Sequence, residues 1–245
     1  MTARPTATPG AKMQYLIKRR PSTAREELVA HWFSNHMPIV AGAQRAAAEA
    51  GRLHARRYVA TLFDADRSGD HPWDGVAQLW WDRALPMPDV PHGSTPTDSF
   101  QEKAEPYVPW ATTEYVVIDP SAHLPVEPLT LNDPFPTTRS GFHKVTFLVG
   151  ARDGVDHDEL CATWLDAHVP NVEGAMRETG GLGYMVSQTI DPDTAPYAGM
   201  AELVFRDLDG WKSFVATVGP DAFSDYTDAA RTVVLTSHVE MIGIP

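Results

Sequence analysis

The sequence contains an internal repeat that runs through most of its length. A short apolar segment that begins at Lys12 is followed by a helical stretch ending in Trp-x-x-x-His-x-Pro, and the same order begins again at Lys144. The motif residues match without a gap, Trp32 with Trp164 and His36 with His168. A repeat of this kind predicts two copies of one structural unit. It also selects one histidine that is present in both halves.

The composition is that of a globular chain and narrows the range of partners. The 245 residues are 43% hydrophobic and carry a formal net charge of −12. Polyanion binding depends on clustered Lys and Arg, and the only dense basic runs are residues 18–20 and 56–57. We therefore expect neither nucleic acid nor a membrane surface as a partner. No apolar run approaches the roughly 20 residues that a membrane helix needs.

The single cysteine, Cys161, cannot form an intramolecular disulfide. This suits a reducing cytoplasm, which is the predicted location. Because Cys161 lies in a predicted helix beside apolar residues, we interpret it as a buried structural residue rather than a nucleophile. Residues 1–10 are rich in Thr, Ala and Pro, and we expect a disordered tail there rather than a signal peptide.

The first copy of the repeat has the element order β-α-β-β-α-β, which is the ferredoxin-like order. Thr23 and Glu26 form a Thr-x-x-Glu capping box that starts the first helix, and Pro38 should stop it just after His36. The other expected elements of this copy are strands at 13–18, 54–63, 75–82 and 112–119 and a short helix at 98–105.

The second copy repeats this order. Asp156 and Glu159 offer a similar start signal for a helix at 156–169. The third strands of the two copies match as Gly75-Val-Ala-Gln-Leu and Gly199-Met-Ala-Glu-Leu. The remaining expected elements are strands at 143–149, 183–190, 199–206 and 237–244 and an amphipathic helix at 208–234 that is broken near Gly219-Pro220.

Two proline-rich segments interrupt the repeat. Residues 120–140 should form an extended linker between a first unit at 11–119 and a second unit at 141–245. Residues 83–98 have no counterpart of that length in the second half. They form either a plain surface loop or a lid over a pocket, since long loops in compact domains are often functional.

The expected architecture is one closed barrel made by both units. A four-stranded antiparallel sheet with helices on one face leaves the other face bare, and the residues expected there are large and apolar. Leaving them wet would cost roughly 25 cal/mol per Å². The prediction is therefore an α+β fold in which two tandem ferredoxin-like units pack their sheets into one intramolecular barrel.

These motifs resemble those of a known family. The strand that opens with Lys, the helix that ends in Trp-x-x-x-His-x-Pro and the Gly-x-Ala-[Glu/Gln]-Leu strand are similar to the EthD family of the dimeric α+β barrel superfamily. The resemblance implies a pseudo-two-fold barrel with one potential pocket per half, between sheet and helices. Related barrels include cofactor-free monooxygenases, cyclases, dehydratases and haem enzymes, so the resemblance implies no single reaction.

His36 and His168 are the first candidates for catalysis. An imidazole titrates near neutral pH, so it can accept and return a proton in one cycle. The alternative is a helix-end histidine that caps carbonyls or bonds within the core. Tyr58 and Tyr184, on second strands, are candidates to polarise a carbonyl or supply a proton. Glu202, at the strand position of Gln78 in the first copy, is a second acid/base candidate or a solvated carboxylate.

Aromatic side chains are the candidates for substrate binding. Trp32 and Trp164 share a helix face with the histidines and either wall an apolar pocket or pack in the core. Strand alternation places the neighbouring residues Trp80 and Trp81 on opposite sheet faces. The full set of substrate-binding candidates is Trp32, Trp164, Trp80, Trp81, Phe205 and Trp211. No histidine pair has the zincin spacing, so no metal site is predicted.

These residues are compatible with three functions. The first is an enzyme without a tightly bound organic cofactor, which acts on a small apolar aromatic or carbonyl compound by His-mediated proton transfer, as a lyase, dehydratase or cyclase does. The second is a cofactor-independent monooxygenase, or a non-catalytic helper that binds a hydrophobic intermediate for an oxygenase. The third is a haem protein with one His as axial ligand. The fused barrel could also form a homodimer.

Overall fold

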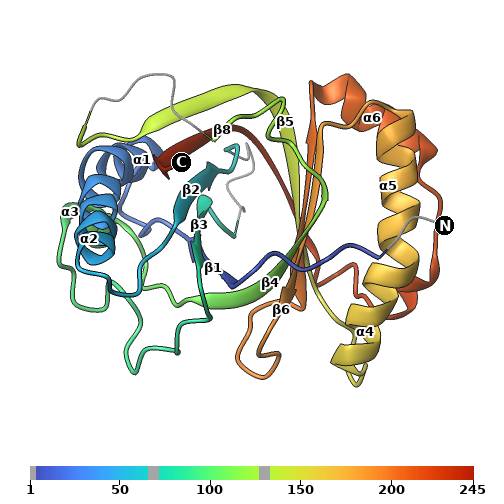
Figure 1. The fold of residues 1–245 in the computed structure, drawn as a ribbon, viewed down its shortest axis with the longest axis horizontal. Helices are drawn as coiled ribbons and strands as arrows, with labels where there is room; N and C mark the ends of the chain where they lie inside the picture. Colours follow the sequence, from blue (N-terminus) through green and yellow to red (C-terminus); the bar gives the residue numbers. More distant parts are fainter. Residues whose placement is uncertain (1–3, 66–71, 127–132) are drawn as a thin grey trace. The chain divides into compact units, whose positions relative to one another are not determined.

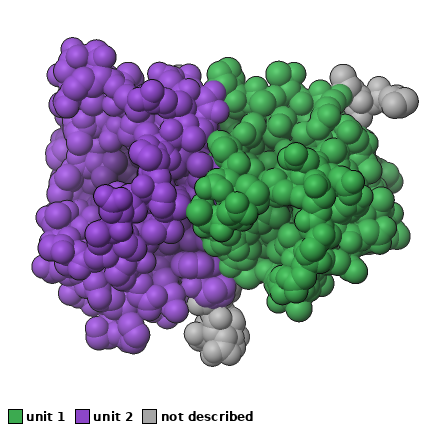
Figure 2. Space-filling model, turned by 90° about the horizontal axis from the view of Figure 1, so that it is seen from below, with its two compact units in different colours: residues 1–9, 112–125, 141–238 green, residues 10–111, 126–140, 239–245 purple. Residues whose placement is uncertain are grey.

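The computed structural model describes residues 4–65, 72–126 and 133–245. The described residues form a mixed α+β fold with eight antiparallel strands, and the chain divides into two compact units. Unit 1 comprises residues 1–9, 112–125 and 141–238, and unit 2 comprises residues 10–111, 126–140 and 239–245 (Figure 2). Unit 2 therefore carries the first Trp-x-x-x-His motif, and unit 1 carries the second.

In unit 2, strand β3 lies between β1 and β2 and is antiparallel to both, while β2 also pairs with the end of β8. The α1, η1 and α2 segments form one continuous helix (Figure 1). The elements are β1 (Ala11–Ile17), α1 (Arg25–His31), the π turn η1 (Trp32–His36), α2 (Met37–Glu49), β2 (Arg57–Leu62), β3 (Gly75–Trp81), α3 (Ser99–Lys103) and the end of β8 (Val233–Ile244).

In unit 1, strand β7 lies between β5 and β6, and β6 also pairs with β4. Helices α5 and α6 lie side by side on one face of this sheet (Figure 1). The elements are β4 (Trp110–Ile118), β5 (Thr137–Val149), α4 (His157–Thr163), the π turn η2 (Trp164–His168), α5 (Val169–Glu178), β6 (Gly183–Thr189), β7 (Gly199–Phe205), α6 (Leu208–Thr217), the 3-10 turn η3 (Ala222–Asp225) and the start of β8.

The predicted strands agree with the structure, but the predicted ends of the long helices were wrong. Neither helix stops at its proline, because each continues through a π turn, to Glu49 in unit 2 and to Glu178 in unit 1. The N–H of Met37 donates to the carbonyl of Trp32, five residues back. Pro38 has no N–H and cannot continue the i→i−4 hydrogen bonds of an α-helix. The wider π turn before it lets the helix continue past this position.

Two other helix predictions were also wrong in part. Thr23 does not cap the first helix, which begins after Ala24 without a side-chain cap. The matching prediction for the second copy is confirmed, since Asp156 accepts a hydrogen bond from the N–H of Glu159 at 3.0 Å. The helix expected at 208–234 ends at Thr217, before Gly219-Pro220, and only the short turn η3 follows it.

The helix-facing sides of the sheets are apolar, and a glycine makes room for each tryptophan. A Cβ atom added to Gly199 would lie 2.6 Å from Cζ3 of Trp164, and one added to Gly75 would lie 3.0 Å from Cζ3 of Trp32. Both indoles are buried in their cores. A carbonyl of the neighbouring strand, from Thr61 or Ser187, lies 2.6 Å from the same added Cβ. The glycine of the Gly-x-Ala motif is therefore explained by the close approach of both an indole ring and a strand carbonyl.

The opposite sides of the sheets carry buried polar groups among apolar ones, which corrects in part the expectation of large apolar side chains there. In unit 1, the Nζ atom of Lys144 lies 2.6 Å from Oε1 of Glu202, and both side chains are buried. In unit 2, the matching strands place Gln14 beside Gln78, with their amide groups 3.3 Å apart. Burial of these groups is tolerated because the charges are paired and the amides are hydrogen-bonded.

The described part of the predicted tail is hydrogen-bonded within unit 1. The N–H of Thr8 donates to the carbonyl of Glu114 at 2.7 Å, and Ala7 forms a bridge with Tyr115. Residues 1–3 of the tail and 127–132 of the predicted linker lie outside the described residues. Among the described helices, none is long and apolar enough to cross a membrane.

Candidate functional site

Each repeated histidine makes a close contact with an aspartate. His36 and Asp98 meet through Nδ1 and Oδ2 at 2.6 Å in unit 2, and His168 and Asp221 meet through the same atoms at 2.8 Å in unit 1. A carboxylate can only accept, so each Nδ1 carries the hydrogen and donates it. In a neutral ring held in this way Nε2 carries the lone pair, as a general base requires.

The two aspartates also fix the start of the next short helical segment. Oδ1 of Asp98 accepts from the N–H of Gln101 at 2.9 Å, and Oδ1 of Asp221 accepts from the N–H of Phe223 at 2.9 Å. Each carboxylate therefore binds the histidine with one oxygen and a helical turn with the other. This arrangement holds the imidazole in one tautomer and one orientation.

A phenylalanine two residues beyond each aspartate packs on the histidine. The ring centroids of His36 and Phe100 are 4.5 Å apart, and those of His168 and Phe223 are 4.6 Å apart. Sequence reasoning missed these residues and their aspartates. The signal was present, because Asp98-Ser-Phe and Asp221-Ala-Phe match in the two halves.

The tryptophan and tyrosine candidates of each unit also lie together. Tyr58 stands opposite Leu79 and Tyr184 opposite the matching Leu203, so the two tyrosines are equivalent. In unit 2, Nε1 of Trp32 donates to Oη of Tyr58 at 3.0 Å. In unit 1 the same pair meets with poorer geometry: a hydrogen bond from Trp164 still opposes the rise in the pKa of Tyr184, but the contact falls short of the geometry seen in unit 2.

Unit 1 contains a cavity of about 320 Å³ between its sheet and its helices. His168 lines it, and this side chain is 27% exposed. Most of the other lining residues are aromatic or aliphatic, which is typical of a site for a small apolar molecule. They include Phe147, Trp164, Val172, Tyr184, Ala201, Leu203, Trp211, Phe214, Val218 and Phe223.

The electrostatics of this site favour a neutral histidine. Burial lowers the pKa of His168 below its usual value, although the nearby Asp221 carboxylate opposes this shift. Burial would raise the pKa of Asp221, but hydrogen bonds from Asn171 and His168 hold that pKa below its usual value. Burial raises the pKa of Tyr184, against the opposing effect of Trp164, so its hydroxyl stays protonated.

In unit 2, aromatic rings gather at the matching place. Tyr15, which corresponds to Phe147, packs against His92 and Tyr107 with centroid distances of 5.9 and 6.1 Å. His92 belongs to the 83–98 loop, and its backbone forms a bridge with Tyr107. The loop therefore lies against the aromatic cluster of unit 2. Burial lowers the pKa of His92 and raises the pKa of Tyr107 to about 12.

The remaining candidates lie away from the unit 1 cavity. Glu202 is on the opposite side of the sheet, where it pairs with Lys144. Phe205 is fully buried and packs on Trp211, a lining residue. In unit 2, Trp80 and Trp81 lie in different hydrophobic clusters, as strand alternation predicts.

Cys161 is half-buried and lies 3.4 Å from Nε2 of His157. Burial raises the pKa of its thiol to about 11, so the sulfur is a thiol rather than a thiolate near neutral pH. Within the described ranges, no group of three or more His, Cys, Asp or Glu side chains could hold a metal ion.

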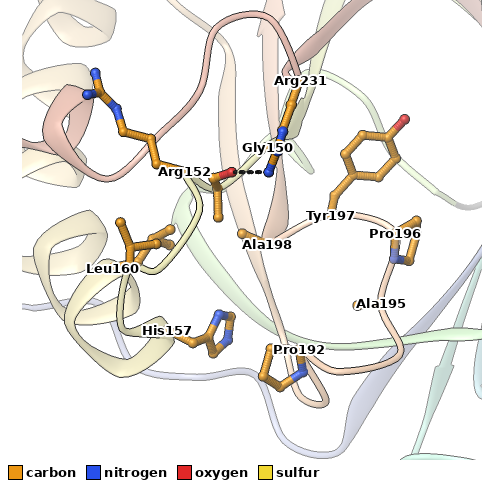
Figure 3. A pocket seen from close by; sticks show the side chains of 12 residues that line it. Gly150, Arg152, His157, Leu160, Pro192, Ala195, Pro196, Tyr197, Ala198 and Arg231 are labelled. Atoms are coloured by element: carbon orange, nitrogen blue, oxygen red, sulfur yellow. Dashed lines mark hydrogen bonds between the residues drawn. The ribbon is translucent and has the colours of Figure 1, made fainter.

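A second cleft of about 250 Å³ in unit 1 carries two arginines at its edge (Figure 3). Arg231 is paired with Asp153 at 2.5 and 2.9 Å. Arg152 donates to the carbonyls of Ser224 and Thr227. Because both guanidinium groups already have partners, this cleft makes a weaker case for a ligand site than the cavity at His168.

Comparison with known proteins gives a fold and no family. No protein-family model matches the chain, and no curated protein matches it. The structure is similar to that of an anthrone oxidase-like protein, with a TM-score of 0.54 and 9% identity, over 95% of this chain and 92% of that one. This likeness shows a shared fold and does not single out EthD.

Two further solved structures are similar at a lower level. A mutant chlorite dismutase from Candidatus Nitrospira defluvii has a TM-score of 0.45 and 10% identity, over 94% of this chain and 92% of that chain. A haem-binding protein from Thermus thermophilus has a TM-score of 0.43 and 12% identity, over 96% of this chain and 93% of that chain. TM-scores this low carry no argument about the function of the chain.

Proposed function

We propose that the chain is an enzyme that removes a proton from a small apolar phenolic or carbonyl compound, with His168 as the base. The observation that carries this proposal is the His168–Asp221 pair at the wall of an apolar cavity. Nδ1 is held by the carboxylate, so Nε2 is the atom available to a ligand. The apolar walls suit a ring-bearing compound with few polar groups.

In this mechanism His168 is neutral before reaction and takes the proton on Nε2. Asp221 keeps the proton on Nδ1 and stabilises the imidazolium that forms, which is the role of the carboxylate in other His–Asp pairs. Phe147, Trp211 and Phe214 surround the apolar body of the substrate and exclude water. In a dehydration the C–H electron pair forms a C=C bond, the C–O bond breaks, and the proton leaves on the hydroxyl as water. In a cyclisation the carbanion forms a C–C bond with a carbonyl carbon, and the proton returns to that carbonyl oxygen.

An oxidative reaction is the second candidate, and the fold of an anthrone oxidase-like protein favours it. A carbanion formed at His168 could react with O₂ without a bound cofactor. One CH₂ group and one O₂ then become one C=O group and one water, so the substrate supplies all the electrons. The same base serves both candidates, and only the fate of the carbanion differs.

Haem fits the cavity poorly. Nε2 of His168 could serve as an axial ligand, but a porphyrin also brings two carboxylates that need cationic or polar partners. None of the described residues that line the cavity is Lys or Arg. We therefore assign no step to haem.

We also propose that the two repeats, 11–119 and 141–245, are EthD-like ferredoxin units whose sheets close into one barrel. The matching element order of the repeats and the likeness to the anthrone oxidase-like protein support this. Cleavage at a protease site engineered into residues 120–140 should leave the two fragments associated in gel filtration. Fragments that separate without denaturant would contradict the proposal.

The function is tested with His168→Ala and the matched variant His36→Ala. Each protein is incubated with a panel of phenolic and β-carbonyl compounds, with and without O₂, and consumption is followed by mass spectrometry. Turnover should fall by roughly 10² to 10⁴-fold in His168→Ala, and His36→Ala should stay close to wild type. Ligand binding without turnover in the wild type would favour the non-catalytic helper, and turnover that survives both substitutions would exclude the histidines as bases.

A further inference from the structure

The two threonines that line the unit 1 cavity have already given away their hydroxyl hydrogens. Thr227 donates to the carbonyl of Phe223 at 3.3 Å, and Thr232 donates to the carbonyl of Asp228 at 2.9 Å. A hydroxyl contains one hydrogen and two lone pairs. The threonine oxygens can therefore offer a ligand lone pairs only.

The buried aromatic donors of the cavity are also occupied. The indole N–H of Trp164 and the hydroxyl of Tyr184 act on each other, and neither atom has accessible surface. Trp211 also lines the cavity, and its side chain is only partly buried. Among the described lining residues, this leaves the indole N–H of Trp211 as the single side-chain donor for a ligand.

His168 presents one edge of its ring to the cavity. Asp221 accepts the hydrogen of Nδ1 at 2.8 Å, and Phe223 stacks on one face of the ring with the centroids 4.6 Å apart. Burial lowers the pKa of His168, which favours the neutral ring. Nε2 then carries a lone pair. It is a further acceptor at the cavity, and it is also a base.

We infer that the ligand of the unit 1 cavity is a hydroxyarene, an aromatic ring with an O–H group, that donates this O–H to Nε2 of His168. A carbonyl or ether oxygen has only lone pairs, so it would meet the lone pair of Nε2 with no hydrogen between them. A phenol O–H supplies that hydrogen, and its oxygen keeps lone pairs for the indole N–H of Trp211. The aromatic walls of the cavity suit the ring.

This inference rests on the proposed function and names the atom that loses the proton. The O–H bond breaks, its electron pair stays on the oxygen, and the proton forms an N–H bond at Nε2 of His168. The products are a phenolate and an imidazolium, and Asp221 stabilises the imidazolium. A phenol hydroxyl has a pKa of about 10, whereas aliphatic alcohols and aryl amines are far weaker acids. The phenolate shares its charge with ring carbons, one of which becomes the carbanion that both candidate reactions need.

The test compares three probes that differ at one position of the ring. 1-Naphthol has an O–H group, 1-methoxynaphthalene keeps the oxygen without the hydrogen, and 1-methylnaphthalene has neither. Binding to the full chain is measured by calorimetry in wild type, in His168→Phe and in the matched control His36→Phe. Wild type and His36→Phe should bind 1-naphthol about tenfold or more tighter than 1-methoxynaphthalene, which corresponds to about 1.4 kcal/mol. His168→Phe should lose most of this preference.

Three results would overturn the inference. One is a wild type that binds 1-naphthol no tighter than the other two probes, including a wild type that binds none of them. Another is a preference that survives His168→Phe, and the third is an equal loss in His36→Phe. Circular dichroism and thermal unfolding verify that each variant is folded, and the alanine variant at the same position replaces any that is not.

The same probes separate this inference from the proposed function. Turnover of a carbonyl compound that depends on His168, in a protein without preference for 1-naphthol, would keep the proposed function and overturn the inference, because the proton would then come from a C–H group. A preference for 1-naphthol that depends on His168, in a protein without turnover of any compound in the panel, would keep the assignment of the ligand and overturn the proposed function.

Discussion

The His168 site of unit 1 and the His36 site of unit 2 share the same arrangement of histidine, aspartate and phenylalanine, which we call the frame, but the space beside the frame differs. Both place an imidazole between an aspartate and a phenylalanine at the end of a π turn. In unit 1 the space beside this frame is an apolar cavity. In unit 2 the rings of His92 and Tyr107 lie against Tyr15 at the corresponding position.

The difference arises outside the repeated residues. His92 comes from the 83–98 loop, which has no counterpart of equal length in the second half, and Trp211 comes from helix α6. Asn171 gives Asp221 an additional hydrogen bond at 2.6 Å, whereas Ile39 stands at the corresponding position in unit 2. The repeat thus supplies the histidine and its partners, and the inserted segments decide whether a ligand has room beside them.

The largest expected effect comes from Asp221→Asn compared with Asp98→Asn. An amide can present a donor to Nδ1 and so favour the wrong tautomer, which in other His–Asp pairs costs about 10⁴-fold in turnover. We expect at least about 10²-fold for Asp221→Asn and less than twofold for Asp98→Asn, measured as kcat on a substrate found in the panel. Because Asn caps helices as well as Asp does, both variants should fold. Equal effects in the two variants would mean that both sites are catalytic.

The next largest effect should be a difference in the free energy of unfolding between Tyr58→Phe and Tyr184→Phe. Loss of the Tyr58 hydroxyl leaves the buried N–H of Trp32 without its acceptor, which should cost about 1–3 kcal/mol in the free energy of unfolding. Loss of the Tyr184 hydroxyl removes only the weaker contact with Trp164 and should therefore lower stability by less than loss of the Tyr58 hydroxyl does. Urea denaturation of both variants measures the difference. A larger loss in Tyr184→Phe would show that its contact with Trp164 is the stronger of the two.

The pH dependence should follow from the lowered pKa of His168. The base must be neutral, so kcat/KM should be constant above a pKa that lies below 6.5 and should fall about tenfold per pH unit beneath it. The free energy of unfolding should also fall as the pH falls. The unfolded chain binds a proton at His168 more readily than the folded chain does, so this residue destabilises the fold as pH drops below about 6.5. An acid limb above 6.5 in a pH–rate profile would contradict this assignment.

The smallest effect should follow from removing a ring in unit 2. His92→Ala takes away the imidazole that packs on Tyr15 and Tyr107, and it should open space beside His36. We expect an aromatic probe such as 1-naphthol to bind weakly at this place in addition to the unit 1 cavity, seen as a change in calorimetric stoichiometry from one towards two. Trp211→Ala serves as the comparison in unit 1, where first-site binding should weaken instead.

The strands, the paired histidines and the paired tryptophans were predictable from the sequence, because each of them occurs in both copies of the repeat. Asp98 and Asp221 were missed because they lie in loops, where aspartate is common, and only the fold brings them to the histidines. The π turns were missed because one extra residue barely disturbs the hydrophobic pattern of a helix. The role of Glu202 depends on Lys144, which lies opposite Val204 and reaches Glu202 diagonally across the strand pair, so this contact becomes evident only from the structure.

Other predictions need different evidence. The EthD resemblance rests on short motifs, and no family model matches the chain. The domain boundaries, the cytoplasmic location and a homodimer of the fused chain stay predictions. Each concerns surfaces or surroundings that neither the repeat nor the site geometry determines.

Asp221 joins the site to a local folding event. Its carboxylate binds His168, Asn171 and the backbone N–H of Phe223, and Phe223 is itself part of the cavity wall. A ligand that needs His168 in place therefore favours the ordered form of residues 221–225, and by thermodynamic reciprocity their order favours the ligand. Amide hydrogen exchange in this segment should slow on saturation, so the short turn would report occupancy of the cavity even when no reaction occurs.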